Sequence, residues 1–244
     1  ILRIDVDGDD YPTDPERNYA IPEANPFATG GGRPEVLHLG VRNPWRCAID
    51  AVAGHLYVAD VGQEQREEVN VVPIDATELN FGWRCLEGDW CTGLSGCRCD
   101  DRTLVAPVHV YDHGIGCSIT GGVVYRGQDI PDLCGTYFFA DFCNGWLWSW
   151  RWQNGIVTDF TNRTMELDPP GPDFLGFVSS FGVDAMGEIY VASLFGGTLF
   201  RIVAGGPPQP AVCVGDLDGN AVVGFDDLVT CLLYTSPSPR DPTK

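Results

Sequence analysis

The sequence predicts an all-β protein, and two observations carry that prediction. Helical periodicity is almost absent before residue 220, whereas short apolar runs bounded by glycine, aspartate and proline recur along the chain. Glycine and proline supply 30 and 18 of the 244 residues. This content is high for a helical protein and usual for short strands joined by tight turns.

A sequence repeat indicates how the strands are grouped. Residues 48–62 (AIDAVAGHLYVADVG) resemble residues 182–196 (GVDAMGEIYVASLFG), with an aspartate, a turn ending in glycine and a strand in each. Tyr57 and Tyr190 lie 133 residues apart, which fits three units of about 44 residues, the size of a propeller blade. Taken alone, the pattern is also that of a common hairpin. With the even spread of strands, it makes a β-propeller the first architecture we expect and a β-sandwich the second.

The expected strands follow the apolar runs in chain order. The runs are HLYVADVG, ITGGVVYRG, GTYFFADF, GWLWSWRW and GEIYVASLFGGTLFRIV, at 55–62, 119–127, 135–142, 145–152 and 187–203. The Gly/Pro-rich stretch AGGPPQPAV (204–212) is interpreted as a linker. Only the segment after it has a helical pattern.

Composition and net charge limit the number of domains and the classes of partner that we expect. A hydrophobic content of 44% is enough for a sizeable core, and the length suits one large or two small domains. The net charge of −19 argues against a nucleic-acid partner and favours cations. No apolar run approaches the ~20 residues that a membrane span needs.

The ten cysteines indicate the compartment. Cys97 and Cys99 are too close together for the usual zinc half-site, so disulfides in an oxidising compartment are the better interpretation. We therefore expect a secreted or periplasmic protein. The chain begins ILRIDVDGDD, without methionine and as though inside a strand, and we interpret this N-terminus as a cut.

The stretch GVRNPWRCAID (40–50) is the first candidate site. Pro44 fixes its own backbone and favours an extended Asn43, just before a strand-like run. On a propeller such loops face the central mouth, where ligands bind. Arg42 could pair with a carboxylate, while Asn43 offers a donor and an acceptor. The alternative is a structural ion pair with an asparagine turn cap.

At these residues the chain resembles a known family, the soluble quinoprotein glucose/sorbosone (aldose sugar) dehydrogenases, which includes the Hedgehog-interacting-protein-like propellers. The resemblance spans residues 1 to about 203. It is carried by ILRID, YAIPEANPF, GVRNPWR, LYVADVGQEQREEVN, NFGWRCLEG, CSITGGVVYRG, YFFADFCNGWLW, SSFGVDAMGEIYV and GTLFRI. It implies a six-bladed β-propeller, of which this chain would supply about the last four blades.

The resemblance also implies a cofactor, pyrroloquinoline quinone (PQQ), bound with Ca²⁺. Arg42 and Asn43 would contact the quinone. The cofactor's calcium would take the backbone carbonyls of Gly62 and Gln63, which as hard oxygen ligands suit that ion.

A second calcium site is implied as well. It would use Glu68 together with the carbonyl of Phe81.

Two departures from the family pattern bear on catalysis. The family's general base is a histidine upstream of ILRID, so no catalytic residue is assigned in this chain. A family lysine falls near Cys143, and family arginines fall in FVSSFG (177–182), which has no basic residue. The four histidines are expected to be structural, with His113 the best exception because its loop would face the mouth.

The resemblance suggests disulfide partners too. It favours Cys117 with Cys143, and Cys85 with either Cys97 or Cys91. The remaining cysteines Cys47, Cys99 and Cys134 stay unassigned.

The C-terminal segment has calcium-loop spacing and resembles half of a type I dockerin. Ala221 stands where an EF-hand-like loop prefers glycine, so the affinity should be low. The alternative is an Asp-rich linker turn. The expected ligands are Asp216, Asp218, Asn220, the carbonyl of Val222, and Asp227.

We therefore expect four regions: a truncated propeller at 1–203, the linker at 204–212, a partial dockerin/EF-hand-like repeat at 213–232 and an artefactual tail at 233–244. The leading function is PQQ-dependent oxidation of aldose sugars by hydride transfer, in a fragment that lacks the catalytic base. The rival is a non-catalytic secreted propeller that binds a protein or glycan. A sugar substrate is the expected small molecule, and the dockerin-like repeat would take a cohesin-like or other extracellular protein as its partner.

Overall fold

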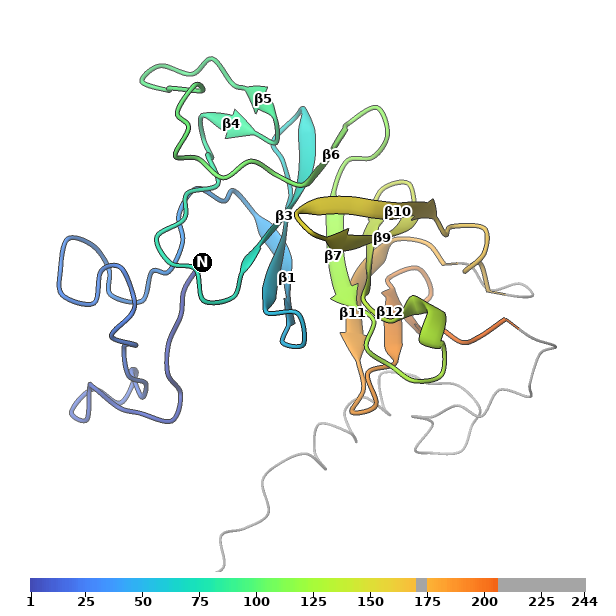
Figure 1. Cartoon of the computed structure of the whole chain (residues 1–244), viewed down its shortest axis with the longest axis horizontal. Helices are drawn as coiled ribbons and strands as arrows, with labels where there is room; N and C mark the ends of the chain where they lie inside the picture. The colour runs from blue at the N-terminus through green and yellow to red at the C-terminus, as the bar shows by residue number, and fades with distance from the viewer. Residues whose placement is uncertain (170–174, 206–244) are drawn as a thin grey trace, which may run out of the picture.

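The computed structural model describes residues 1–169 and 175–205. Its strands form three antiparallel sheets of four, four and three strands, and a small two-stranded sheet (Figure 1). Sheet A contains β1 (Pro44–Asp50), β2 (His55–Asp60), β3 (Arg66–Pro73) and β6 (His109–Asp112), hydrogen-bonded in that order.

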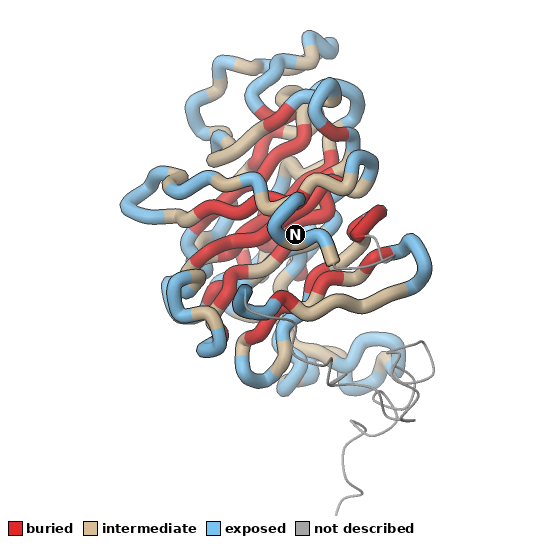
Figure 2. Tube along the Cα trace, turned by 90° about the vertical axis from the view of Figure 1, so that its right-hand side faces the viewer, coloured by how far each residue is buried: buried red, intermediate tan, exposed pale blue. Residues whose placement is uncertain are grey.

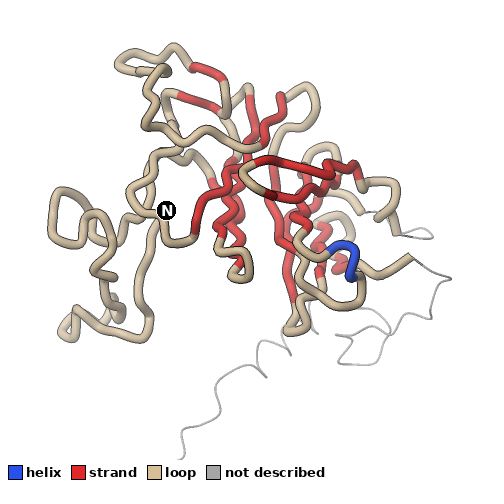
Figure 3. Tube along the Cα trace, in the orientation of Figure 1, coloured by secondary structure: helices blue, strands red, loops and turns tan. Residues whose placement is uncertain are grey.

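Sheets B and C follow in chain order. Sheet B contains β7 (Ile119–Val124), β8 (Thr136–Asp141), β9 (Leu147–Gln153) and β10 (Ile156–Asn162). Sheet C contains β11 (Val178–Val183), β12 (Ile189–Ser193) and β13 (Thr198–Arg201). The small sheet pairs β4 (Leu86–Glu87) with β5 (Trp90–Cys91). Within the described ranges, the single helix is a short 3₁₀ turn, η1 (Pro131–Leu133), drawn in blue in Figure 3.

The sheets pack face to face because their side chains alternate between two apolar faces. On β8, Tyr137 and Phe139 join a cluster shared with sheet A, while Phe138 and Ala140 join a cluster shared with sheet C. Tyr57 of β2 stacks on Tyr137 with ring centroids 4.7 Å apart. Figure 2 shows the resulting buried strands at the centre of the molecule. Sheet B is therefore buried on both faces, as in an inner blade of a propeller.

Polar contacts fix the first strands of the three sheets to one another. The Trp45 indole donates to the Ser179 carbonyl at 3.0 Å, which joins β1 to β11. At the other end of β1, Arg126 pairs with the buried Asp50, with Nε to Oδ1 at 3.0 Å. Thr120 of β7 donates to the Val178 carbonyl. The first strands thus begin at one common end, called here the mouth end.

The mouth end is made of the loops before each first strand and after each second strand. These loops are residues 41–43, 61–65, 113–118, 142–146, 175–177 and 194–197.

The all-β prediction is confirmed, and each of the five predicted runs contains strand residues. The spacing of the repeat is different from the prediction. Tyr57, Tyr137 and Tyr190 lie on the second strands of successive sheets. The 133 residues from Tyr57 to Tyr190 therefore cover two steps between sheets and not three. The first step is longer because the segment carrying β4 and β5 is inserted before β6.

The count of about four blades is not reproduced in the described part of the chain, which has three sheets of blade size. Residues 1–43 contain isolated bridges, such as Leu2 with Val36 and Asp5 with Ala20, and no longer strand. The one alternating apolar run here, Leu2, Ile4 and Val6, is exposed and buries no face, and the rest of the segment is rich in proline, glycine and aspartate.

Three disulfides are present among the described residues. Cys117–Cys143 and Cys85–Cys97 agree with the expected pairs, and Cys91–Cys99 is added by the structure. Cys47 and Cys134 are free and exposed. None of the helices in the described ranges is long and apolar enough to cross a membrane.

Several expectations lie outside the described residues. They are most of the 204–212 linker, the tail, and the loop with Asp216, Asp218, Asn220, Val222 and Asp227.

Candidate functional site

Asp60, at the end of β2, fixes the backbone of the Arg42–Asn43 pair. Its Oδ2 accepts the Arg42 N–H at 2.7 Å and its Oδ1 accepts the Asn43 N–H at 2.6 Å. The Val61 N–H then donates to the Asn43 carbonyl at 3.1 Å. These bonds hold residues 42–43 against residues 60–61 at the mouth end of sheet A.

The Arg42 side chain turns toward the loop after β2 and binds neutral acceptors there. Its Nε donates to Gln63 Oε1 at 2.9 Å, and its Nη1 donates to the Val61 carbonyl at 3.1 Å. The guanidinium also lies 5.6 Å from the centre of the Trp83 ring, within the range of a cation–π contact. Arg42 therefore forms no structural ion pair with a buried carboxylate, which was the alternative interpretation.

A small hollow lies between Arg42 and the acidic ends of β2 and β3. Its volume is about 10 Å³, room for about one water molecule. Three carboxylates and two guanidiniums contribute to its wall. The lining residues are Arg42, Asp60, Val61, Gly62, Arg66, Glu68, Trp83, Leu86, Glu87 and Gly88.

Two buried carboxylates face each other across the β2–β3 pairing at this hollow. Asp60 and Glu68 are paired in register and are 3% and 6% exposed. Burial, and after it the charge of Asp60, raise the pKa of Glu68 to about 7. Burial also raises the pKa of Asp60, against the opposing hydrogen bonds from the N–H groups of Arg42 and Asn43. Such a pair favours a bound positive charge.

A buried amide oxygen lies beside this pair. Asn70 Nδ2 donates to Glu68 Oε1 at 2.9 Å, and Asn70 is fully buried. Its Oδ1 has no hydrogen-bond partner among the described residues. A buried acceptor without a donor is costly, and a cation would satisfy it.

The loop after β2 is organised by one carboxylate oxygen. Glu87 Oε1, on β4, accepts the N–H groups of Gln63, Glu64, Gln65 and Arg66 at 2.9, 2.8, 2.5 and 3.0 Å. Burial acts to raise the pKa of Glu87, but these four bonds outweigh it and lower the pKa.

The structure brings together some of the sequence-predicted residues. Arg42, Gly62 and Glu68 line one hollow. Asn43 is exposed, and Gln63 reaches Arg42 from outside the hollow. Phe81 is a core residue, packed with Leu56 and Val58 rather than at the hollow.

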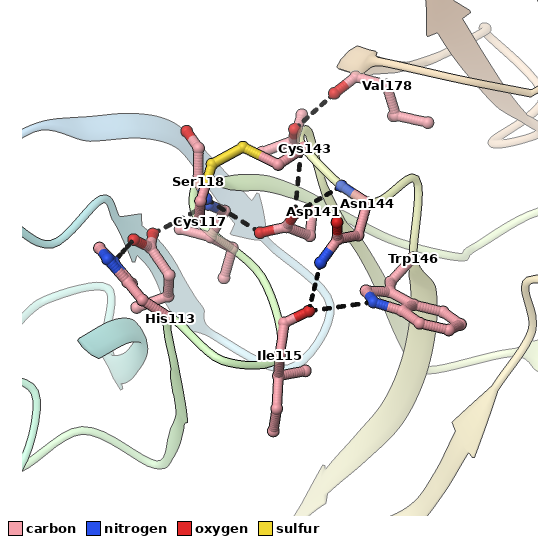
Figure 4. Close-up of a disulfide and its surroundings, with 12 residues drawn as sticks. His113, Ile115, Cys117, Ser118, Asp141, Cys143, Asn144, Trp146 and Val178 are labelled. Atoms are coloured by element: carbon pink, nitrogen blue, oxygen red, sulfur yellow. Dashed lines mark hydrogen bonds and ion pairs between the residues drawn. A yellow bond between two sulfur atoms is a disulfide. The ribbon is translucent and has the colours of Figure 1, made fainter. Parts of the chain in front are cut away.

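The mouth position of sheet B is closed by a disulfide. Cys143, where the resemblance places a lysine, is bonded to Cys117 (Figure 4). The buried Asp141 supports both loops: Oδ2 accepts the Ser118 N–H at 2.9 Å, and Oδ1 accepts the Cys143 and Asn144 N–H groups at 2.9 and 3.0 Å. This network is structural, because it satisfies the turn N–H groups.

At the mouth end of sheet C, the segment 177–182 (FVSSFG) carries no charged side chain. Ser179 and Ser180 stand on β11, in the region where the resemblance places arginines. Phe177 lies before them and contacts Phe142 and Phe195, at centroid distances of 5.3 and 6.5 Å. Arg42 therefore has no basic counterpart at these two positions.

His113 lies on a mouth-end loop as expected, at the outer edge of sheet A. Its Nε2 is 2.8 Å from Oε1 of Glu67, whose side chain is fully buried (Figure 4). Glu67 Oε2 also accepts the Ile119 N–H at 2.8 Å. The pair joins the outer strand of sheet A to β7, which is a structural role.

The other histidines agree with a structural interpretation. His38 is buried and its ring packs edge-on against Phe81 at 5.8 Å. His109 on β6 lies among aromatic rings. His55 begins β2.

Sequence reasoning missed three residues of this site: Asp60, Asn70 and Glu87. Asp60 stands inside the quoted run LYVADVG, directly before the predicted calcium loop, and its polarity at a strand end was an available signal. Glu87 lies 21 to 24 positions from its partners, so only the fold reveals its role.

Comparisons with known proteins agree on one protein family. The family described as Glucose / Sorbosone dehydrogenase matches residues 16–166. The HIPL1 protein of Arabidopsis thaliana is 33% identical over 83% of this chain, and the Hedgehog-interacting protein of Homo sapiens is 25% identical over 83% of it. The chain spans 33% and 27% of these two relatives, about a third or less of the length of the curated proteins it matches.

Solved structures resemble the fold. A glucose dehydrogenase superposes with a TM-score of 0.61 at 19% identity, covering 76% of this chain and 51% of that one. The PQQ-bound form of an aldose sugar dehydrogenase from Streptomyces coelicolor gives a TM-score of 0.51 at 18% identity, covering 71% and 42%. At these identities the likeness shows a β-propeller-like fold and nothing finer.

Proposed function

Because the chain belongs to the glucose/sorbosone dehydrogenase family, we propose that its mouth end is a calcium-organised binding face of a secreted propeller, which takes a protein partner. The observation that carries the proposal is the group of buried oxygens beside Arg42. Asp60 and Glu68 are paired carboxylates, and Asn70 has a buried oxygen without a donor.

Among the described residues, no three histidine, cysteine, aspartate or glutamate side chains form a metal-binding group, so a hard cation here would rely on amide and carbonyl oxygens as well as carboxylates. Ca²⁺ takes six to eight oxygens from carboxylates, amides, carbonyls and water. Glu68 and Asn70 would supply two, and Asp60 would add charge, while Gly62 lines the same hollow as Asp60 and Glu68. The wall carries three carboxylates against two guanidiniums, so it is negative when all are ionised. Gln63 stays a proposed ligand through its carbonyl, and the Phe81 carbonyl stays a proposed ligand of the second calcium site that the resemblance implies.

The residues at the mouth fit the quinone less well. The hollow, about 10 Å³ in volume, is far smaller than a tricyclic cofactor, which would have to lie over the mouth end and outside the hollow. Two of the Arg42 donors already bind acceptors in the loop after β2. A disulfide and two serines occupy the positions at which the resemblance places a lysine and arginines. We therefore derive no catalytic step through the quinone.

Sequence similarity to a protein-binding relative and the net charge of the chain both support a protein partner. One relative bears the name Hedgehog-interacting protein, and the charge of −19 favours a basic partner surface. Three disulfides suit an oxidising, extracellular setting.

PQQ-dependent oxidation of an aldose is the second candidate. It is favoured by the shared hollow of Arg42 and Gly62, which brings together the two family motifs. PQQ would supply the hydride acceptor, with Arg42 and Asn43 as its contacts; this chain offers no assigned base. The calcium loop at Asp216–Asp227, its possible cohesin-like partner and the four domain boundaries also stay proposals.

Calorimetric titration separates the two candidates. The full chain with Asp216→Ala, which silences the C-terminal loop, is titrated with Ca²⁺ and then with PQQ. We expect calcium binding that Glu68→Gln weakens, and no saturable PQQ binding. Calcium-dependent PQQ binding that Arg42→Ala abolishes would favour the oxidative candidate, and absence of calcium binding would contradict both.

A further inference from the structure

We infer that Glu87 is a positioning residue, which sets the loop 62–65 so that its carbonyl oxygens are presented to a cation. This inference rests on the proposed calcium function and adds to it a residue of the same hollow that acts through the backbone of the loop. Glu87 is 5% exposed and lies on the two-residue strand β4.

Four successive backbone N–H groups converge on one carboxylate oxygen. Glu87 Oε1 accepts all of them, from residues 63 to 66, within 3.0 Å. Successive backbone N–H groups rarely point to one side without an anion to hold them, and a carboxylate oxygen is such an anion.

Peptide geometry then fixes the direction of the carbonyls in the loop. In a planar trans peptide the C=O points opposite to the N–H of the next residue. The four N–H groups belong to the peptides whose carbonyls come from residues 62–65. Holding the N–H groups on Glu87 therefore turns these carbonyls away from Glu87.

Most of these carbonyls accept no hydrogen bond within the part of the protein that the structure describes. The Gln65 carbonyl accepts the His113 N–H at 3.3 Å. The carbonyls of Gly62, Gln63 and Glu64 accept no hydrogen bond from the described residues. They stand as ligands for a hard cation, which the loop would offer in place of water.

The shape of the loop also depends on Gly62. At Gly62, a Cβ would collide with the Arg66 carbonyl. Any side chain there would open the loop and move its N–H groups off Glu87. Gly62 and Glu87 therefore act together.

A matched pair of substitutions tests the inference. Glu87→Asp keeps the charge but withdraws the oxygen by one methylene, and Glu188→Asp makes the same change at a second buried glutamate. Glu188 Oε1 accepts the N–H groups of Gln128 and Asp129 at 2.9 and 3.0 Å, at the end of the sheets opposite the mouth. Glu87→Gln serves if Glu87→Asp does not fold, since it removes the charge that the four N–H dipoles face.

The full chain carrying Asp216→Ala is the parent for every variant. Binding is followed by Tb³⁺ luminescence sensitised by Trp83, which lines the hollow, with Ca²⁺ as competitor. Melting curves confirm that each variant is folded. We expect the folded Glu87 variants to bind Ca²⁺ about 10- to 100-fold more weakly, the usual loss when a group supporting metal ligands is changed. Glu188→Asp should keep the parent's affinity.

Two results would overturn the inference while leaving the calcium function intact: parent-like affinity in a folded Glu87 variant, or an equal loss in Glu188→Asp. A parent chain that binds no calcium would instead overturn the proposed function, and this inference with it.

Discussion

His109 should make the fold sensitive to acid, and the size of the effect can be worked from its surroundings. The ring lies on β6, stacked on Phe160 at 5.2 Å and edge-on to Phe139 at 5.4 Å. Burial among these groups lowers the pKa of His109 from 6.5 to about 4. The folded state therefore resists protonation, whereas the unfolded chain accepts a proton near its ordinary pKa.

The sign follows from proton linkage. Between pH 6.5 and 4 the unfolded state binds more protons, so the stability from neutral His109 is complete above pH 6.5 and is lost as the pH falls toward 4. With 1.36 kcal/mol per pKa unit, the free energy of unfolding should fall by about 2 kcal/mol between pH 8 and pH 5 from this group alone.

His109→Phe tests this value, because phenylalanine fits an aromatic site and cannot titrate. Chemical denaturation of both proteins is measured at intervals from pH 8 to pH 5. The buried carboxylates contribute equally to both, so the difference between the two curves isolates His109. We expect the variant to gain about 2 kcal/mol relative to wild type at pH 5; a difference that does not change with pH would refute the argument.

Three further predictions concern the frame of the molecule and its C-terminal loop. Arg126→Ala should lower the free energy of unfolding by about 2 kcal/mol in urea denaturation, because it leaves the buried Asp50 without its charged partner; a loss below about 0.5 kcal/mol would show that water replaces the arginine. Thiol titration of the denatured, unreduced chain should find at most four of the ten cysteines, since six are paired; ten reactive thiols would contradict the disulfides. In a C-terminal peptide, Asp216→Ala should abolish the helicity gained with calcium and Ala221→Gly should increase it; no response to calcium in either would make the segment a linker.

The strands were predictable because their pattern is local. Runs such as GTYFFADF combine aromatic and β-branched residues with turn residues at both ends, and each contains strand residues. The number of blades was not predictable from the repeat. Tyr57 and Tyr137 are separated by an insertion that carries β4, β5 and two disulfides. A period measured in residues cannot distinguish an insertion from an additional blade.

The candidate site was predictable in part for the same reason. Arg42 and Gly62 meet because Asp60, at the end of a predicted strand, holds the residues before β1. The role of Glu87 depends on β4 folding back over the loop, and nothing in a linear pattern shows that contact.

The calcium claim is tested most directly by an anomalous-difference map from crystals of the full chain grown with Tb³⁺ in place of Ca²⁺. We expect a peak at the mouth end of sheet A, with a Glu68 oxygen about 2.3–2.6 Å from the ion. The carbonyls of the 62–65 loop should face that peak. An anomalous peak confined to the C-terminal loop, with the Asp60–Glu68 hollow empty at saturating Tb³⁺, would show that the mouth end of sheet A holds no calcium.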